Sequence, residues 1–242
     1  MVTLPVHKKN ESYCVQPGKI LALGKNYLDH IAEQRQVNVS GFDDDIPKEP
    51  IVFAKTPNVL IGPEAPIVIP PFIYDYGFEE VRTHYEAELA FIIKETCKDV
   101  PVDRAYEKIL GFTCMNDVSQ RNIQSGDKSG WFRGKSFDTF GPVGPQIVLT
   151  EDIGNAQDLR IQCRRNGKVV QDSNTRHMIF SIAETVAFLS RNFTLNAGDL
   201  ITTGTPGGVG QIRHGDVVEI EIQGIGTLRN PVIDEGQKRL ST

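Results

Sequence analysis

The segment THYEAELAFII, residues 83–93, constrains the fold more than any other part of the chain. Successive side chains of a β-strand point to opposite faces, so Leu89 and Phe91 share one face while Ala90 and Ile92 lie on the other. Both faces are therefore apolar toward the end of the segment. This pattern predicts a strand that enters a hydrophobic core.

The same alternation places two glutamates side by side near the start of this strand. His84, Glu86 and Glu88 share one face. Two carboxylates at that spacing repel each other unless water or a cation separates them. Two interpretations fit this segment taken alone: a solvated acidic face, or a site that holds a cation.

The rest of the chain is rich in short runs with strand character, separated by Pro and Gly. We expect strands at 19–24, 51–55, 58–62, 66–70, 111–118, 199–204, 216–226 and 227–232, and a hairpin around Asn166-Gly167. The helical periodicities are fewer, at 26–34, 102–110 and 180–193. Few helices among many short strands predict a β-rich α+β domain and not a doubly wound sheet.

Length and charge narrow the classes of protein to which the chain can belong. Its 242 residues suit one large domain, or one domain with an extension, and we set residues 1–16 apart from a single domain at 17–242. The net charge of -5 argues against a nucleic-acid partner. No apolar run approaches the roughly 20 residues that cross a bilayer, so no membrane association is expected.

The cysteines indicate the compartment. Cys14, Cys97, Cys114 and Cys163 are scattered and lack the spacing of a zinc site or a disulfide framework. Free thiols are typical of a reducing cytosol, and the start of the chain lacks the apolar region of a signal peptide. We expect a cytoplasmic protein. Cys114 is either a buried structural thiol or a nucleophile.

A third carboxylate follows another predicted strand. Asp117 lies at the polar end of 111–118, and neighbouring strands are about 4.8 Å apart. If the two strands pair, Asp117 meets Glu86 and Glu88 in a site made only of oxygen ligands. Such a site suits Mg²⁺ or Mn²⁺. The comparable E-x-E pair at 219–221 has no companion motif, and we interpret it as solvated.

Three further motifs each allow a functional and a structural interpretation. His30 and Glu33 are neighbours on one predicted helix face, as a base with its orienting carboxylate or as a surface pair. Lys135, in a Gly- and aromatic-rich loop, either meets an anionic substrate or is solvated. The glycine-rich segment 202–210 fits neither the Walker nor the Rossmann pattern, and we expect a turn that presents N–H groups to a carboxylate.

Taken in order, the motifs of the chain resemble those of the fumarylacetoacetate hydrolase family, short single-domain branch, over about residues 17–232. The segments that carry this resemblance are GKNYLDHIAE, PIVFAKTPN, HYEAELAF, GFTCMNDVSQRNIQ, GKSFDTFGPVGP, RNGKVVQ, NAGDLITTGTPGGVG and HGDVVEIEIQGIGTLRN. The resemblance implies the mixed β-roll of that family's C-terminal domain and a homodimer. It also implies a lid at about residues 26–48, which is longer and more acidic here than a compact lid.

The resemblance assigns roles to ten residues. It implies that Glu86, Glu88 and Asp117 bind Mg²⁺ or Mn²⁺. It implies that His30 and Glu33 form a catalytic dyad. It further implies that Lys135 contacts the substrate, and that the substrate pocket is lined by Lys55, Arg121, Gln124 and Thr205.

The implied activity is metal-dependent chemistry on a small 2-oxo or β-diketo acid. The expected reaction is hydrolysis of a C–C bond in an acylpyruvate-type substrate through a metal-stabilised enolate. The same site also suits an oxaloacetate decarboxylase or tautomerase, or an isomerase of 2-hydroxyhepta-2,4-diene-1,7-dioate. A non-catalytic binding protein that keeps the cation as a structural clip is the alternative from another class.

Overall fold

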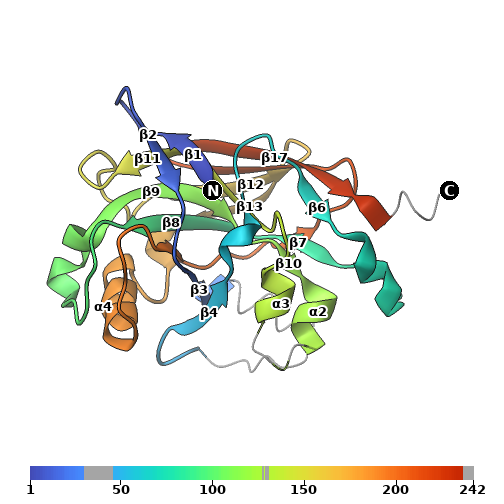
Figure 1. Ribbon diagram of the computed structural model, residues 1–242, viewed down its shortest axis with the longest axis horizontal. Coiled ribbons are helices and arrows are strands. Elements are labelled where there is room, and N and C mark those ends of the chain that lie inside the picture. Colours follow the sequence, from blue (N-terminus) through green and yellow to red (C-terminus); the bar gives the residue numbers. More distant parts are fainter. Residues whose placement is uncertain (30–45, 127, 129–130, 237–242) are drawn as a thin grey trace.

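The computed structural model describes residues 1–29, 46–126, 128 and 131–236. A mixed seven-stranded sheet runs through its centre in the order β4-β3-β14-β8-β9-β11-β5 (Figure 1). Its strands are β3 (Ile20–Gly24), β4 (Ile51–Lys55), β5 (Leu60–Ile61), β8 (Ala87–Ile93), β9 (Ile109–Asn116), β11 (Gly141–Leu149) and β14 (Leu200–Thr202). The pairs β14–β3 and β11–β5 are parallel, and the other neighbours are antiparallel. The predicted buried strand is confirmed as β8, in the middle of this sheet.

The two faces of β8 pack into two separate hydrophobic clusters. Leu89 and Phe91 belong to the larger cluster, and Ala90 and Ile92 belong to the smaller one. Every residue of β8 is buried. The alternation read from the sequence therefore describes a strand with a core on each side, and its acidic end is carried into the interior.

A second sheet of five strands has the order β13-β12-β16-β17-β6. Its strands are β6 (Ile67–Ile69), β12 (Arg160–Arg165), β13 (Lys168–Asn174), β16 (Val217–Ile222) and β17 (Gly226–Asp234). The predicted hairpin joins β12 to β13, and Asn166 and Gly167 both have positive φ, at 53° and 77°. Two such residues in succession form the turn that matches the twist of paired strands.

A small third sheet, β10-β7-β15, completes the strands around the acidic residues. It consists of β7 (Thr83–Tyr85), β10 (Ser119–Gln120) and β15 (Gly210–Gln211). The segment 83–93 thus contributes to two sheets, because β7 pairs with β10 and β15 whereas β8 pairs with β9 and β14. The expectation of one continuous strand was wrong at Glu86, where the chain passes from one sheet to the other.

The helices lie around these sheets. In the part of the chain that the structure describes, they are α2 (Arg121–Gly126), α3 (Phe132–Lys135) and α4 (Ile182–Asn192), with 3₁₀ turns at Pro57–Val59, Pro71–Tyr76, Val102–Lys108 and Thr175–His177. The predicted helix at 180–193 is confirmed as α4. It begins with a capping box between Ser181 and Glu184. Figure 1 shows α2 and α3 side by side and well apart from α4. The β-rich α+β class is confirmed.

The first 16 residues, which we set apart as an extension, form a hairpin of β1 (Val2–Pro5) and β2 (Ser12–Val15). Val2, Leu4 and Val15 pack into the smaller of the two hydrophobic clusters. The hairpin therefore contributes to the core that covers one face of β8.

Candidate metal centre

The peptide at the passage from β7 to β8 is held by two side-chain amides. Asn116 accepts a hydrogen bond from the N–H of Glu86 at 2.9 Å, and Gln171 accepts one from the N–H of Ala87 at 3.0 Å. A buried backbone N–H without a partner costs free energy. These two side chains replace the strand partners that the N–H groups lose where the chain changes sheets.

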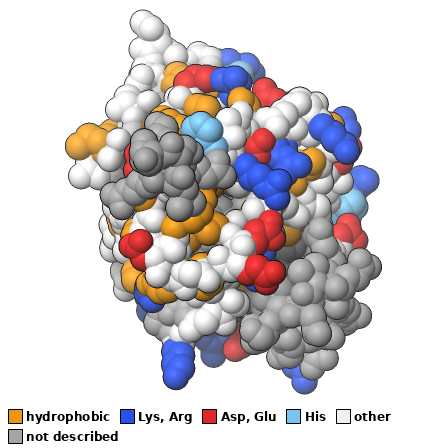
Figure 2. Space-filling model, turned by 90° about the vertical axis from the view of Figure 1, so that its right-hand side faces the viewer, with side chains coloured by type: hydrophobic (Ala, Val, Ile, Leu, Met, Phe, Trp, Pro, Cys, Tyr) orange, Lys and Arg blue, Asp and Glu red, His pale blue; other side chains and the backbone are white. Residues whose placement is uncertain are grey.

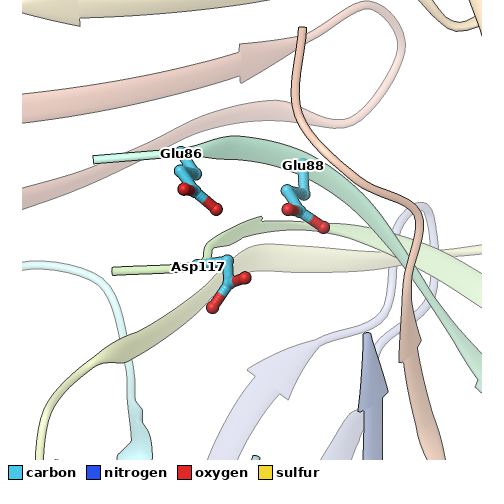
Figure 3. Close-up of side chains that lie close together, drawn as sticks. All are labelled: Glu86, Glu88 and Asp117. Atoms are coloured by element: carbon cyan, nitrogen blue, oxygen red, sulfur yellow. The ribbon is translucent and has the colours of Figure 1, made fainter. Parts of the chain in front are cut away.

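Three carboxylates meet at this point. Asp117 directly follows β9, and its N–H donates to the carbonyl oxygen of Glu86 at 2.9 Å. Glu86, Glu88 and Asp117 are all buried, and each offers an oxygen within 4.8 Å of the others (Figure 3). The predicted meeting of these three residues, here called the carboxylate trio, is confirmed. Their role as metal ligands stays a prediction.

Cationic side chains contact two members of the trio. The ammonium of Lys135 lies 2.6 Å from Glu86 Oε2 and 2.5 Å from Asp117 Oδ2. Lys55 lies 2.6 Å from Asp117 Oδ1, and the guanidinium of Arg121 pairs with Glu86. The repulsion between Glu86 and Asp117 is therefore offset by direct ion pairs.

Burial and charge act in opposite directions on the two lysines. Burial would lower the pKa of Lys135, but Asp117 and Glu86 outweigh it and hold that pKa above its usual value. Burial lowers the pKa of Lys55, although Asp117 opposes the shift. Lys135 is thus the lysine whose charged form the trio favours.

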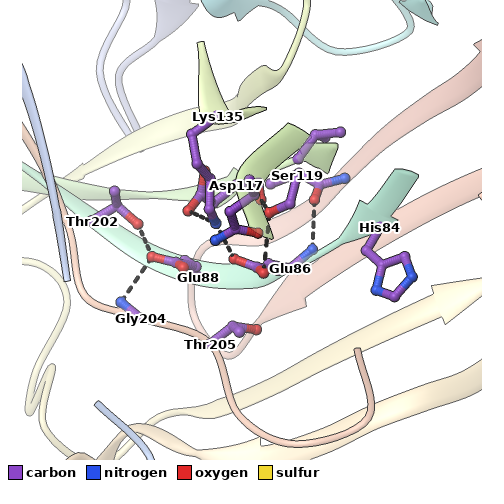
Figure 4. Close-up of polar contacts among 12 residues, drawn as sticks. His84, Glu86, Glu88, Asp117, Ser119, Lys135, Thr202, Gly204 and Thr205 are labelled. Carbon is purple, nitrogen blue, oxygen red and sulfur yellow. Dashed lines mark hydrogen bonds and ion pairs between the residues drawn. The ribbon is translucent and has the colours of Figure 1, made fainter. Parts of the chain in front are cut away.

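Glu88 is the member of the trio that forms no ion pair with a described residue. Its Oε2 accepts hydrogen bonds from the Thr202 hydroxyl and from the N–H of Gly204, the latter at 2.8 Å (Figure 4). Burial raises its pKa well above the usual value, and Asp117 and Glu86 raise it further. An all-oxygen cluster with one carboxylate short of a cation suits a hard divalent ion.

The glycine-rich segment 202–210 supplies that backbone donor, as its sequence predicts. Gly204 has a φ of 88°, and a Cβ there would lie 2.8 Å from Cβ of Asn26. At Gly208, with a φ of 92°, a Cβ would lie 2.1 Å from the carbonyl oxygen of Val170. These two glycines let the segment turn against Glu88 and against β13.

A pocket opens beside the trio, with an empty volume of about 300 Å³ that includes solvent space at its mouth. Glu86 and Glu88 line it together with Lys135. Its apolar wall contains Phe53 and Trp131, whose rings meet edge to face at 5.7 Å between centroids. The pocket thus combines charged and aromatic side chains, and the Lys135 ammonium lies over the Phe53 ring, 5.0 Å from its centroid.

Three of the four residues expected to line a substrate pocket do line this one: Arg121, Gln124 and Thr205. Lys55 is not among the lining residues. Its side chain is fully buried behind Asp117, and its ammonium also donates to the carbonyl oxygen of Lys135. This geometry gives Lys55 a structural place in the cluster and no direct contact with the pocket.

His30 and Glu33 lie outside the described residues, as does most of the expected lid. Asn26 marks where that segment begins: its side chain accepts from the N–H of Phe180 and donates to the carbonyl oxygen of Thr203, both at 2.8 Å. His84, which shares a face with the glutamates in the sequence, accepts a hydrogen bond from Arg121 at 3.3 Å.

Sequence reasoning missed the polar side chains that hold the trio and the peptide between Glu86 and Glu88. Asn116, Thr202 and Gln171 each hold part of the site, as does Ser119, whose hydroxyl donates to Glu86 at 3.1 Å. Each lies in or next to a predicted strand, but alternation does not distinguish a polar residue with a buried partner from a solvated one.

The other E-x-E pair lies outside this cluster, but it is half-buried where the sequence predicted a solvated pair. Glu219 and Glu221 are half-buried on β16, and Glu221 pairs with Arg164 of the neighbouring strand with 43% of its side chain exposed. Cys114 is a free thiol in the core, and burial raises its pKa, which disfavours a nucleophilic role.

On the face in Figure 2, Lys and Arg side chains lie among Asp and Glu side chains and form no continuous basic surface in the part of the chain that the structure describes. None of the helices described has the length and apolar character that crossing a bilayer requires.

Comparison with known proteins places this chain in a family. Residues 19–233 match the family described as fumarylacetoacetate (FAA) hydrolase C-terminal. A mitochondrial oxaloacetate tautomerase of Xenopus laevis is 42% identical over 90% of this chain and 66% of its own length.

Two solved structures share the fold. The 5-carboxymethyl-2-hydroxymuconate delta-isomerase of Mycobacterium smegmatis has a TM-score of 0.78 and 40% identity, covering 91% of this chain and 78% of its own. The fumarylpyruvate hydrolase of Pseudomonas aeruginosa, solved with Mn²⁺ and pyruvate, has a TM-score of 0.82 and 29% identity, covering 97% and 96%. The chain therefore belongs to the fumarylacetoacetate hydrolase family and is an enzyme of the type that this family's C-terminal domain forms.

Proposed function

We propose that this enzyme uses Mg²⁺ or Mn²⁺ to hydrolyse a C–C bond of an acylpyruvate-type 2-oxo acid. The observation that carries the proposal is the buried carboxylate trio, in which Glu88 has no ion-pair partner among the described residues, at the wall of a pocket. The relative from Pseudomonas aeruginosa, solved with Mn²⁺ and pyruvate, supports both the cation and the 2-oxo acid.

The charges around the pocket suit an anionic substrate. Arg121 and Lys135 line it with their cationic groups, and both already neutralise a carboxylate of the trio. A cation held by the trio would take over part of this neutralisation, so that Arg121 and Lys135 could pair with the carboxylate of a bound substrate. The rings of Phe53 and Trp131 would contact the apolar part of the substrate and exclude water from it.

The residues divide the chemistry between them. A divalent cation, when bound, supplies a Lewis acid that favours negative charge on the keto oxygen of a 2-oxo acid. Lys135 offsets the anionic charge that develops as the bond beyond C3 breaks. His30, oriented by Glu33, takes a proton from the water that attacks the distal carbonyl. The products are pyruvate and a carboxylic acid.

A second reaction has its own support in the relatives. An oxaloacetate tautomerase and a 5-carboxymethyl-2-hydroxymuconate delta-isomerase are similar to this chain, and a tautomerisation or an isomerisation adds no water to its substrate. The same residues would stabilise an enolate in that reaction and in a decarboxylation. The two candidates differ in whether water attacks the substrate.

Assays with a panel of substrates decide between them. With Mg²⁺ or Mn²⁺, we expect pyruvate release from acylpyruvates or fumarylpyruvate, and slower change of oxaloacetate and of a diene-dioate. A chelator should abolish the activity, and the added ion should restore it. Activity that is indifferent to the chelator contradicts the proposal, and turnover of oxaloacetate or the diene-dioate alone favours the second reaction.

Glu88→Gln tests the metal site directly. Loss of one of three carboxylate ligands should weaken Mn²⁺ binding at least tenfold in calorimetry and reduce the rise in melting temperature that Mn²⁺ causes. Glu221→Gln, in the half-exposed E-x-E pair, is the matched control and should bind Mn²⁺ like the wild type. Equal Mn²⁺ affinity in both variants rules out the assignment of the trio.

His30→Ala separates catalysis from a structural cation. We expect turnover to fall by 10²-fold or more, as for loss of a general base, while Mn²⁺ affinity stays unchanged. Kinetics and calorimetry on the same preparation measure both. If turnover persists, the dyad is not catalytic, and a protein without turnover on any substrate that still melts higher with Mn²⁺ is the non-catalytic alternative.

Lys55→Met tests whether Lys55 holds the site or contacts substrate. Removing the lysine leaves Asp117 Oδ1 without its buried cationic partner, while Lys135 stays on Oδ2, so the free energy of unfolding without metal should fall by about 3 kcal/mol in urea titrations. Lys108→Met, in the more exposed pair with Glu95, should leave the free energy of unfolding nearly unchanged. A raised KM with unchanged stability would instead assign Lys55 to the substrate.

A further inference from the structure

Gln171 occupies a special position behind the metal centre. It lies on β13, four residues after the hairpin turn at Gly167, and is only 1% exposed. Its side chain lies between the β7–β8 passage and the segment that contains Thr205. The proposed chemistry does not use it, although it contacts both halves of the site.

The contacts of the Gln171 amide fix its orientation. Oε1 accepts from the N–H of Ala87 at 3.0 Å, and Nε2 donates to the carbonyl oxygen of Pro206 at 2.8 Å. A backbone N–H can only donate and a carbonyl oxygen can only accept, so a flipped amide would lose both bonds. The second N–H of the amide donates to Thr205 Oγ1 at 2.9 Å.

This orientation dictates what the Thr205 hydroxyl can do. The oxygen accepts from Gln171, which leaves its single hydrogen to be donated elsewhere. No residue in the described ranges accepts that hydrogen, and Thr205 lines the pocket together with Glu88 and Lys135. Figure 4 shows Thr205 beside the two glutamates. The hydroxyl therefore offers a hydrogen-bond donor to whatever occupies the pocket.

We propose that Gln171 is a positioning residue that holds Thr205 as a donor to an acceptor oxygen of the 2-oxo acid. The inference rests on the proposed function, because it takes the occupant of the pocket to be that acid. Gln171 also ties Thr205 to the peptide between Glu86 and Glu88. The donor and the metal-binding carboxylates are thus kept at a fixed separation by one side chain.

Calorimetry with pyruvate on the Mn²⁺-loaded protein tests this role. Gln171→Met is close in size and cannot hydrogen-bond Thr205, so the Kd for pyruvate should rise about tenfold, as expected for a weakened hydrogen bond to a charged group. The Kd for Mn²⁺, measured first without pyruvate, should stay within about threefold. An equal loss of affinity for both would assign Gln171 to the metal site and overturn the proposal.

Thr205→Val completes a double-mutant cycle. If Gln171 acts through Thr205, Thr205→Val alone should weaken pyruvate binding at least as much, and adding Gln171→Met should have no further effect beyond about twofold. Additive losses contradict the proposal. Thr205→Ser, which keeps the hydroxyl, should bind pyruvate within about threefold of the wild type, and this arm holds even if Gln171→Met does not fold.

Gln157→Met is the matched control. Gln157 forms the same kind of clamp and is not among the residues that line the pocket; it accepts from the N–H of Ile182 at 2.8 Å and donates to the carbonyl oxygen of Thr175 at 2.7 Å. The Gln157→Met variant should lower the melting temperature about as much as Gln171→Met does and leave the affinity for pyruvate unchanged. If Gln157→Met weakens pyruvate binding as Gln171→Met does, general destabilisation explains both. Absence of pyruvate binding to the wild type would refute the proposed function itself, and the present inference with it.

Discussion

The repulsion between three buried carboxylates is the constraint on which the rest of this structure depends. Buried charges are costly unless they are paired and hydrogen-bonded. Here the partners arrive from separate parts of the chain: Lys55 from the end of β4, Lys135 from the end of α3, and Arg121 from the start of α2. The ends of these elements converge on the trio because its buried carboxylates need cationic partners. Its pairing couples the central sheet to the helices beside it.

The passage of the chain between two sheets is the second part of this arrangement. A continuous strand would satisfy the N–H of Glu86 and Ala87 with a neighbouring strand. Here side-chain amides satisfy them, from Asn116 and from Gln171 of the second sheet. The site is therefore built from interactions between sheets, and its precision depends on long-range packing more than on any one loop.

This dependence explains what could be predicted from the sequence. Strand alternation, a local and periodic rule, placed Glu86 and Glu88 on one face. Asp117 joined them only on the condition that its strand pairs with theirs, and the resemblance to the family supplied the assignment of all three as metal ligands. The break at Glu86 could not be predicted, since an apolar alternating run gives no sign that its two halves join different sheets. The amide partner Gln171 and the buried place of Lys55 depend on packing between distant segments. No spacing in the sequence encodes such contacts.

The balance of charge at the trio has a consequence for the order of assembly. Three carboxylates and three cationic side chains gather at the trio, with Glu88 outside the ion pairs, and with every group ionised their formal charges sum to zero. A divalent ion added to it leaves an excess of two positive charges in a buried place, and an anion bound beside the ion reduces that excess. Ion and anion then strengthen each other's binding by the same factor, since such coupling is reciprocal. The ion is therefore held more tightly when the pocket is occupied by an anion than when its carboxylate ligands act alone.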